Sequence, residues 1–131
     1  MAKARVTITR VKEMKARLRQ VAREFPDLVA RALYLEAQIE LTESKRRVPV
    51  DTGVLRASGQ VVGPDGGTGR KLFVTIAYGG AAESYAIIVH EDLDAFHRIG
   101  QAKYLESVLL ESAPYMADRL AKRVQLNKLK V

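Results

Sequence analysis

The side chains best suited to metal binding or acid–base chemistry lie together in one short stretch. His90, Glu91, Asp92 and Asp94 occur close together, and His97, the second of only two histidines, follows them. Imidazoles and carboxylates are common metal ligands, but the separation of the two histidines fits no usual ligand spacing, and the chain has no cysteine to complete a site. We therefore expect no metal and no cofactor. His90 and Glu91 are instead expected to make structural or intersubunit polar contacts.

Serine chemistry has equally weak support. None of the serines, at positions 44, 58, 84, 107 and 112, lies in a Gly-x-Ser-x-Gly turn. A hydrolase that uses His90 or His97 stays open as an alternative, although the chain suggests no substrate for it. The sequence thus predicts a protein that is not an enzyme and has no small-molecule substrate.

A glycine-rich run at 66–69 could be mistaken for a phosphate-binding loop. It lacks the Lys-Ser/Thr pair of a P-loop, and it precedes a predicted strand rather than a helix. The tip of a long β-hairpin is the better interpretation.

One further set of polar residues could serve a function. It lies at residues 49–58, in a junction between a helical region and a strand region. Asp51 and Thr52 are residues that cap helices by accepting hydrogen bonds from exposed backbone N–H groups. Gly53 can adopt backbone angles that are closed to other residues. The run therefore predicts a short helix over 53–57.

Two further residues of this junction suggest what the short helix does. Leu55 is expected to anchor it to the core, while Arg56 points away and carries a fixed positive charge. The junction either connects a helix to a hairpin and does nothing more, or it presents Arg56 across a subunit boundary.

Length and composition limit the classes of protein that need considering. With 131 residues the chain is long enough for one modest core, so we expect a single domain over 1–131. An apolar content of 47% excludes a disordered chain, and no apolar stretch approaches the roughly 20 residues of a membrane span. The first residues lack the apolar segment of a secretory signal, and we expect no membrane partner.

The net charge of +7 is unevenly distributed. Residues 1–47 carry twelve Lys/Arg against six Asp/Glu, residues 48–100 carry four against six, and residues 101–131 carry six against three. This clustering favours an acidic partner, either nucleic acid or the acidic face of another protein; alternatively, the basic residues form solvated faces of helices. Aromatic residues are few and are not interleaved with the basic ones, as a base-stacking surface requires.

Hydrophobic spacing predicts helices in the first third of the chain. Residues 6–9 are β-branched and suggest a short strand. Spacings of three and four from about Val11 then indicate an amphipathic helix, which Phe25-Pro26 ends. A second helix over about 27–46 is so apolar that it must be buried on more than one side, either in the core or against a partner. Its apolar residues are Leu28, Val29, Ala32, Leu33, Leu35, Ala37, Ile39 and Leu41.

The middle and end of the chain predict a hairpin followed by further helices. Residues 59–63 and 70–78 read as two strands with a loop between them. Residues 84–91 fit a buried strand or a short helix capped by Ser84, and we favour the helix; residues 92–100 read as a loop. A helix from about 102 is expected to stop at 112–114, where Ser112 caps a last helix that ends in a flexible basic tail over about 126–131.

These elements predict an α+β fold. N-terminal helices precede a central antiparallel β-hairpin or small sheet with a long loop, and C-terminal helices pack on that sheet.

The run PVDTGVLRAS at 49–58 resembles the PVDTG-x-L-R-x-S signature of a family of long-tailed bacteriophage neck proteins, known as tail-completion, head–tail joining or minor capsid proteins. YAIIVHE at 85–91 is similar to that family's YA-x-x-V-H/E segment, and KYLE at 103–106 to its K-F/Y-L segment. The order agrees over roughly 10–125. The chain departs from the family after the second segment, where Asp92-Leu93 replace a frequent Gly-Thr.

The resemblance implies a structural virion protein without catalytic activity, made in the cytoplasm of a bacterial host. Such a protein forms a ring, usually hexameric, that completes the tail and joins it to the DNA-filled head. Its partners would be further copies of itself, other neck and tail proteins and, non-specifically, DNA in the lumen. The motif residues Asp51, Thr52, Gly53, Leu55, Arg56, Tyr85, His90, Glu91 and Tyr104 would then serve the fold or the subunit interface. The alternative function is that of a small basic protein that binds nucleic acid without sequence preference.

Overall fold

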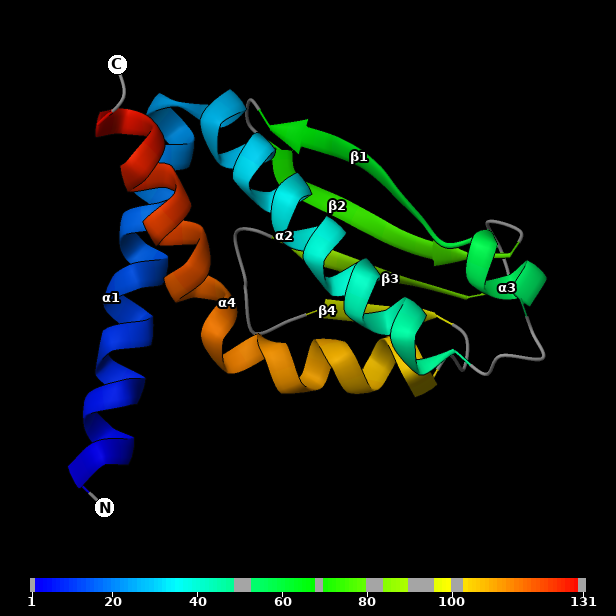
Figure 1. Cartoon of the computed structure of the whole chain (residues 1–131). Helices are drawn as coiled ribbons and strands as arrows, with labels where there is room; N and C mark the ends of the chain where they lie inside the picture. Colours follow the sequence, from blue (N-terminus) through cyan, green and yellow to red (C-terminus); the bar gives the residue numbers. More distant parts are fainter. Residues whose placement is uncertain are drawn as a thin grey trace.

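A computed structural model of the chain describes residues 2–48, 53–67, 70–79, 84–89, 96–99 and 103–129. In this part of the chain, helices enclose one face of a four-stranded antiparallel sheet of order β1-β2-β3-β4 (Figure 1). The predicted α+β fold is confirmed. The elements are α1 (Ala2–Glu24), α2 (Pro26–Arg47), α3 (Gly53–Ala57), β1 (Gln60–Gly67), β2 (Arg70–Tyr78), β3 (Ser84–Val89), β4 (Phe96–Ile99) and α4 (Lys103–Leu129).

Helix α2 is the central element and matches the predicted second helix within one residue at each end. Pro26 at its first position needs no N–H partner, and three basic residues occupy its last turn, where they complement the helix dipole. The helix lies across β1 and β2 and packs along α4 (Figure 1). Its buried apolar residues are Val29, Ala32, Leu33, Ala37 and Leu41.

Two apolar residues of α2 stay outside the core. Leu35 and Ile39 are 40% and 45% exposed, although the sequence grouped them with the buried face. The sequence left open whether the apolar residues of α2 are buried in the core or against a partner. In the structure the core buries one side of the helix, and within the described residues nothing covers the strip that contains Leu35 and Ile39.

The predicted hairpin is confirmed, with a shorter tip than expected. Gln60, Val61 and Val62 pair with Ala77, Ile76 and Thr75, and pairing continues through two register shifts as far as Gly67. Gly63 and Gly66 have φ values of 105° and 82°, which side chains rarely allow. Residues 64–67, predicted as loop, are thus part of an irregular strand, and residues 68–69 lie outside the described range.

Two short segments adopt a different structure from the predicted one. Residues 6–9 are helical within α1, because a weak β preference yields when the flanking residues continue one helical stripe. Residues 84–89, for which we favoured a helix, form strand β3, and part of the predicted loop forms β4. Pairing with β2 on one side and β4 on the other supplies hydrogen bonds that local spacing could not reveal.

The C-terminal region is one helix rather than two. α4 continues through Pro114, and Figure 1 shows it changing direction part-way along its length. A proline inside a helix cannot donate to the carbonyl four residues earlier, so it bends the helix without ending it. The predicted Ser112 cap is therefore wrong. The basic tail expected over about 126–131 is helical as far as Leu129.

The core lies between α2, β2 and α4. Tyr78 is fully buried; its ring meets that of Tyr104 edge to face, with centroids 5.0 Å apart, and its hydroxyl donates to Ser44 Oγ at 2.9 Å. Gly59 sits against the same group of side chains. A Cβ there would lie 2.8 Å from the Tyr78 ring and 3.0 Å from Leu41.

We expect Gly59→Ala to lower the free energy of unfolding by about 1–3 kcal/mol, because a methyl group must displace a buried ring. Gly53→Ala is the matched control. A Cβ at Gly53 meets nothing within 4 Å, so we expect this change to be neutral or to stabilise the chain by up to about 1 kcal/mol. Urea unfolding of both variants measures the difference, and equal effects would contradict the close approach at Gly59.

Candidate functional site

The junction predicted to carry function is built into the fold by Arg56 and Ser58. Arg56 Nη2 donates to the Val48 carbonyl oxygen at 2.8 Å, and Val48 is the C-cap residue that follows α2. Arg56 therefore turns back to close α2 rather than pointing away, which corrects the expected orientation. Ser58 Oγ donates to the Leu55 carbonyl at 2.5 Å and accepts the Gly79 N–H at 2.7 Å, so it links α3 to the end of β2.

Of the other junction residues, Leu55 and Gly53 lie in α3. Leu55 is half-buried and packs against the core, as expected of an anchor. Gly53 begins α3 at an exposed position, and a Cβ there would meet nothing within 4 Å. Asp51 and Thr52 lie outside the described residues.

The motif residues downstream fall in different places. Tyr104, at the head of α4, is half-buried and packs on Tyr78, which makes it a core residue. Tyr85 lies in β3 opposite Ala77. His90 and Glu91 fall outside the described residues. Tyr104 therefore lies in the core and Tyr85 in strand β3. Within the described residues the two do not form one site.

A buried polar cluster joins α2 to α4. Glu36 is fully buried and Glu40 is 3% exposed. Arg119 reaches both: its Nε donates to Glu36 Oε1 at 2.6 Å, and its Nη2 lies 3.0 Å from Glu40 Oε1. Ser112 donates to Glu40 and accepts from Arg119. Two carboxylates therefore share one guanidinium, and Glu36 Oε2 has no hydrogen-bond partner among the described residues.

This arrangement changes the acidity of Glu40. Loss of solvent on burial, together with the nearby charge of Glu36, raises the pKa of Glu40 from 4.5 to about 7, while the Ser112 hydroxyl and the Arg119 charge oppose the shift. Near neutral pH the cluster therefore holds a proton that an exposed glutamate would have released. Its chemistry is that of a structural clamp with one titratable group.

The clamp continues towards the other end of the two helices. Arg47 forms a two-pronged pair with Glu111, with N–O distances of 3.1 and 2.5 Å, and also donates to Ser107 Oγ at 3.0 Å. Because Arg47 ends α2 and Glu111 lies before the bend of α4, the polar contacts follow both halves of the bent helix. They fix the position of α4 on α2 across Pro114.

One pattern in the sequence indicates part of this cluster, although it was not interpreted in that way above. Glu36, Glu40 and Ser44 continue the spacing of Val29 and Leu33 along one face of α2. Charged residues on an otherwise buried stripe indicate a buried partner. Arg119, separated by about eighty residues, could not be matched to them without the tertiary structure.

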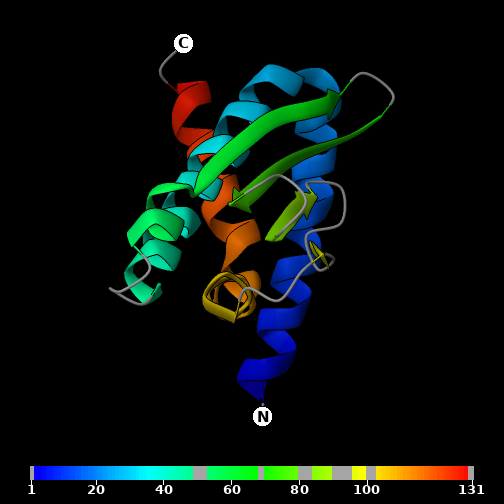
Figure 2. The same ribbon diagram turned by 90° about the vertical axis from the view of Figure 1, so that its right-hand side faces the viewer.

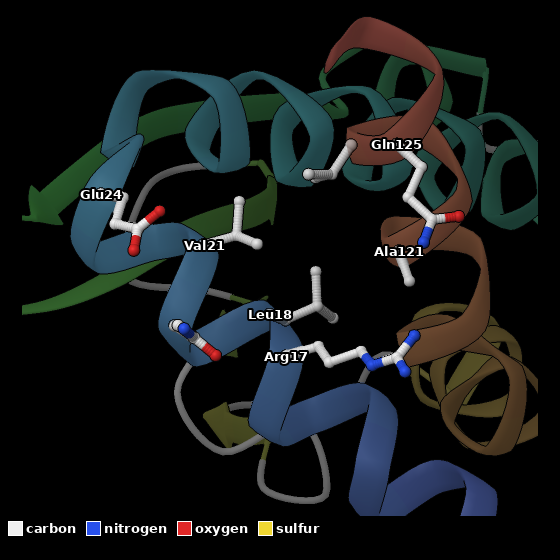
Figure 3. Close-up of a pocket in the computed structure, with 8 residues that line it drawn as sticks. Arg17, Leu18, Val21, Glu24, Ala121 and Gln125 are labelled. Carbon is white, nitrogen blue, oxygen red and sulfur yellow. The ribbon is translucent and has the colours of Figure 1, made fainter. Parts of the chain in front are cut away.

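Two hollows lie on the helical side of the protein. One, of about 260 Å³, lies between α1 and α4; Leu18 and Val21 of α1 face Ala121 and Gln125 of α4 across it (Figure 3). The other, of about 470 Å³, is a shallow groove beside the exposed strip of α2. It is lined by Leu35, Gln38, Ile39, Thr42, Glu43, Arg46 and Arg123. Neither brings together the groups needed for catalysis.

The described residues contain no group of three His, Cys, Asp or Glu side chains placed to hold a metal. Of the predicted acidic and histidine stretch, only His97 is described, opposite Ile87 in the sheet. A search of the described helices for a membrane-spanning segment found none.

Comparison with protein-family models gives one match. Residues 12–107 match the model described as "Bacteriophage HK97-gp10, putative tail-component". This chain belongs to the HK97-gp10-like family. No curated protein and no solved structure matches it. The finding supports a bacteriophage tail component, and the match spans α2, the junction, the sheet and the start of α4.

In this family member we expect Arg119→Met to destabilise the fold by about 3 kcal/mol, because two buried carboxylates lose their only described cation. Lys122→Met is the control on the same helix. Lys122 pairs with Asp118 but is 65% exposed, so its loss should cost about 0.5 kcal/mol or less. Chemical unfolding at pH 7 measures both, and similar values would show that the cluster is not a clamp.

The raised pKa of Glu40 also predicts a pH dependence of stability. Between about pH 4.5 and 7 the folded chain holds a proton that the unfolded chain releases, so the free energy of unfolding should fall as pH rises through this window, by up to about 3 kcal/mol. Glu40→Gln mimics the protonated form and should flatten the slope, whereas Glu13→Gln, exposed on α1, should keep it. A slope unchanged in Glu40→Gln would refute this assignment.

Proposed function

We propose that this protein is a non-catalytic structural component of the virion neck. Copies of it form a hexameric ring at the head-proximal end of the tail, which completes the tail and joins it to the DNA-filled head. The family match over 12–107 carries this proposal. The neck position and the ring go beyond that match and follow the resemblance of residues 49–58, 85–91 and 103–106 to neck proteins.

The surface of the free chain supports assembly. The groove beside α2 is lined by the exposed apolar residues Leu35 and Ile39 and by charged residues that include Arg46 and Arg123. Exposed apolar side chains with a charged rim are typical of protein–protein contact surfaces. The partners we propose are further copies of this chain and other neck and tail proteins, all assembled in the bacterial cytoplasm.

The charge distribution is compatible with DNA that passes through the ring without sequence-specific contacts. Helix α1 carries a net charge of +6 and α4 one of +2, whereas α2 has equal numbers of basic and acidic residues and residues 48–100 carry a slight negative excess. A ring of basic subunits tolerates a DNA duplex in its lumen through phosphate contacts that do not depend on sequence.

The decisive test uses a phage in which the coding sequence of this protein is deleted. We expect electron micrographs of lysates to show DNA-filled heads and separate tails, with joined particles restored when the protein is supplied from a plasmid. Intact, joined and infectious particles without the protein would refute the proposal.

The second candidate is a nucleic-acid-binding protein, and one observation favours it. Lys12, Arg17, Arg19 and Arg23 are all exposed along α1. This function requires the isolated chain to bind DNA with an affinity that falls steeply with salt and is lost when these residues are neutralised. Such binding, together with normal virion joining in the deletion phage, would replace the first proposal with the second.

A further inference from the structure

The sheet has a second face that no described helix covers. Strand register places ten positions on it: Gln60, Val62, Phe73, Thr75, Ala77, Tyr85, Ile87, Val89, His97 and Ile99. We call this set the outer face. α2 packs on the opposite face, which holds Leu72, Val74, Ile76 and Tyr78, all buried. Figure 2 shows the sheet with the helices α2 and α4 gathered on one side of it.

The outer face has the composition of a buried surface. None of its ten positions is Lys, Arg, Asp or Glu, and charge appears only towards the hairpin tip, with Asp65 opposite Phe73 and with Lys71. Val62 is 45% exposed, Phe73 and Thr75 are half-buried, and only the small Ala77 is buried. A strand such as 72–78, apolar towards both faces, is typical of a sheet covered on both sides.

The N-terminal segment of α1 is a helix that could cover the outer face of another copy. α1 packs on α4 and α2 from about Lys15 onward, where Lys15 and Leu18 are buried. Its N-terminal end extends beyond the rest of the fold: in Figures 1 and 2 the first turns of α1 project past every other element. We call residues 2–14 of α1 the arm.

The arm continues the apolar stripe that the rest of α1 buries. Ala4, Ile8 and Val11 precede Lys15 and Leu18 at spacings of four, three, four and three. The stripe therefore runs past the point at which the helix leaves its own fold. A stripe of this kind requires an apolar surface, and the described fold offers none beneath the arm.

We propose that the arm of one copy packs across the outer face of the next copy. The proposal rests on the ring proposed above and names the two surfaces that close it. The arm, roughly 20 Å long at 1.5 Å per residue, is long enough to cross four strands spaced about 4.8 Å apart. Helix on sheet is the same two-layer packing that α2 makes on the other face.

The chemistry of the two surfaces favours the arm of another copy over DNA as the partner of the outer face. Apart from Lys71 at the hairpin tip, the outer face carries no basic residue, so it offers few phosphate contacts and is poorly suited to bind DNA. Lys3, Arg5, Arg10 and Lys12 occupy the other sides of the arm and meet no acid or base on the outer face. Because arm and outer face are different surfaces, the contact is head-to-tail, and it generates a ring where the rotation between successive copies closes.

Chemical cross-linking between copies tests this pairing without background, since the chain has no cysteine. Ile8→Cys in the arm and Thr75→Cys on the outer face are prepared as separate proteins, mixed, and treated with a short bis-maleimide. We expect a covalent dimer in the mixture and none in either protein alone. The double variant should give a ladder of covalent multimers that ends at the ring.

Val54→Cys provides the control position. Val54 is 88% exposed on α3, away from the outer face, and should give no product with Ile8→Cys. A second measurement replaces Ile8 and Val11 with Asp. Light scattering should then show loss of multimers while the thermal midpoint of the monomer stays unchanged, and Lys12→Asp on another side of the arm should keep the multimers.

Several results would overturn the inference. Products from Thr75→Cys alone would indicate sheet-on-sheet pairing, and products from Ile8→Cys alone would indicate pairing of arms. A chain that stays monomeric at the highest concentration used also contradicts it. Multimers of the unmodified chain without an Ile8–Thr75 product would refute the arm contact and leave the ring intact, whereas the deletion phage tests the neck function separately.

Discussion

The fold depends on one guanidinium held between two buried glutamates. Arg119 of α4 contacts Glu36 and Glu40 of α2, and both carboxylates lie on the stripe with which α2 enters the core. Removing two carboxylates from water is unfavourable unless their charge is reduced or matched. Arg119 matches one charge, and the proton retained by Glu40 reduces the other. This contact holds the part of α4 that follows the Pro114 bend against α2, while Arg47 and Glu111 hold the part that precedes it.

The same constraint decides which surfaces remain uncovered. With α2 committed to one face of the sheet and α4 committed to α2, no described helix is left for the outer face. α1 is held at its C-terminal half by α4 and α2, so its arm projects away. Within the described residues, a sheet face, the arm and a strip of α2 therefore have no covering element, as expected of a subunit that completes its core in an assembly. The family of phage tail components to which it belongs is consistent with this state.

Local patterns were sufficient for some elements and failed for others. Helix α2 and the β1–β2 hairpin were predicted because each has a long periodic stripe bounded by Phe25-Pro26 or by glycines. Strands β3 and β4 are short, and their hydrogen bonds come from neighbours in the sheet. The sequence of β3 alone therefore fitted a strand or a helix, and that of β4 fitted a loop. α4 was divided in two because Ser112 and Pro114 look like a helix start, whereas packing on α2 keeps the helix continuous. Arg56 was expected to point outward because its acceptor, the Val48 carbonyl, is a backbone group that no side-chain pattern reveals.

The sequence by itself determined the fold class, the absence of thiol chemistry, the basic character of the helices and the resemblance to phage neck proteins. These properties depend on residue type and on spacing within a few turns, which the chain carries locally. Only the tertiary structure decided that Arg119 meets Glu36 and Glu40, that Tyr104 packs on Tyr78, and that Tyr85 pairs with Ala77 in the sheet. Each of these depends on segments that are far apart in the chain, and their proximity is set by how the helices and the sheet pack together.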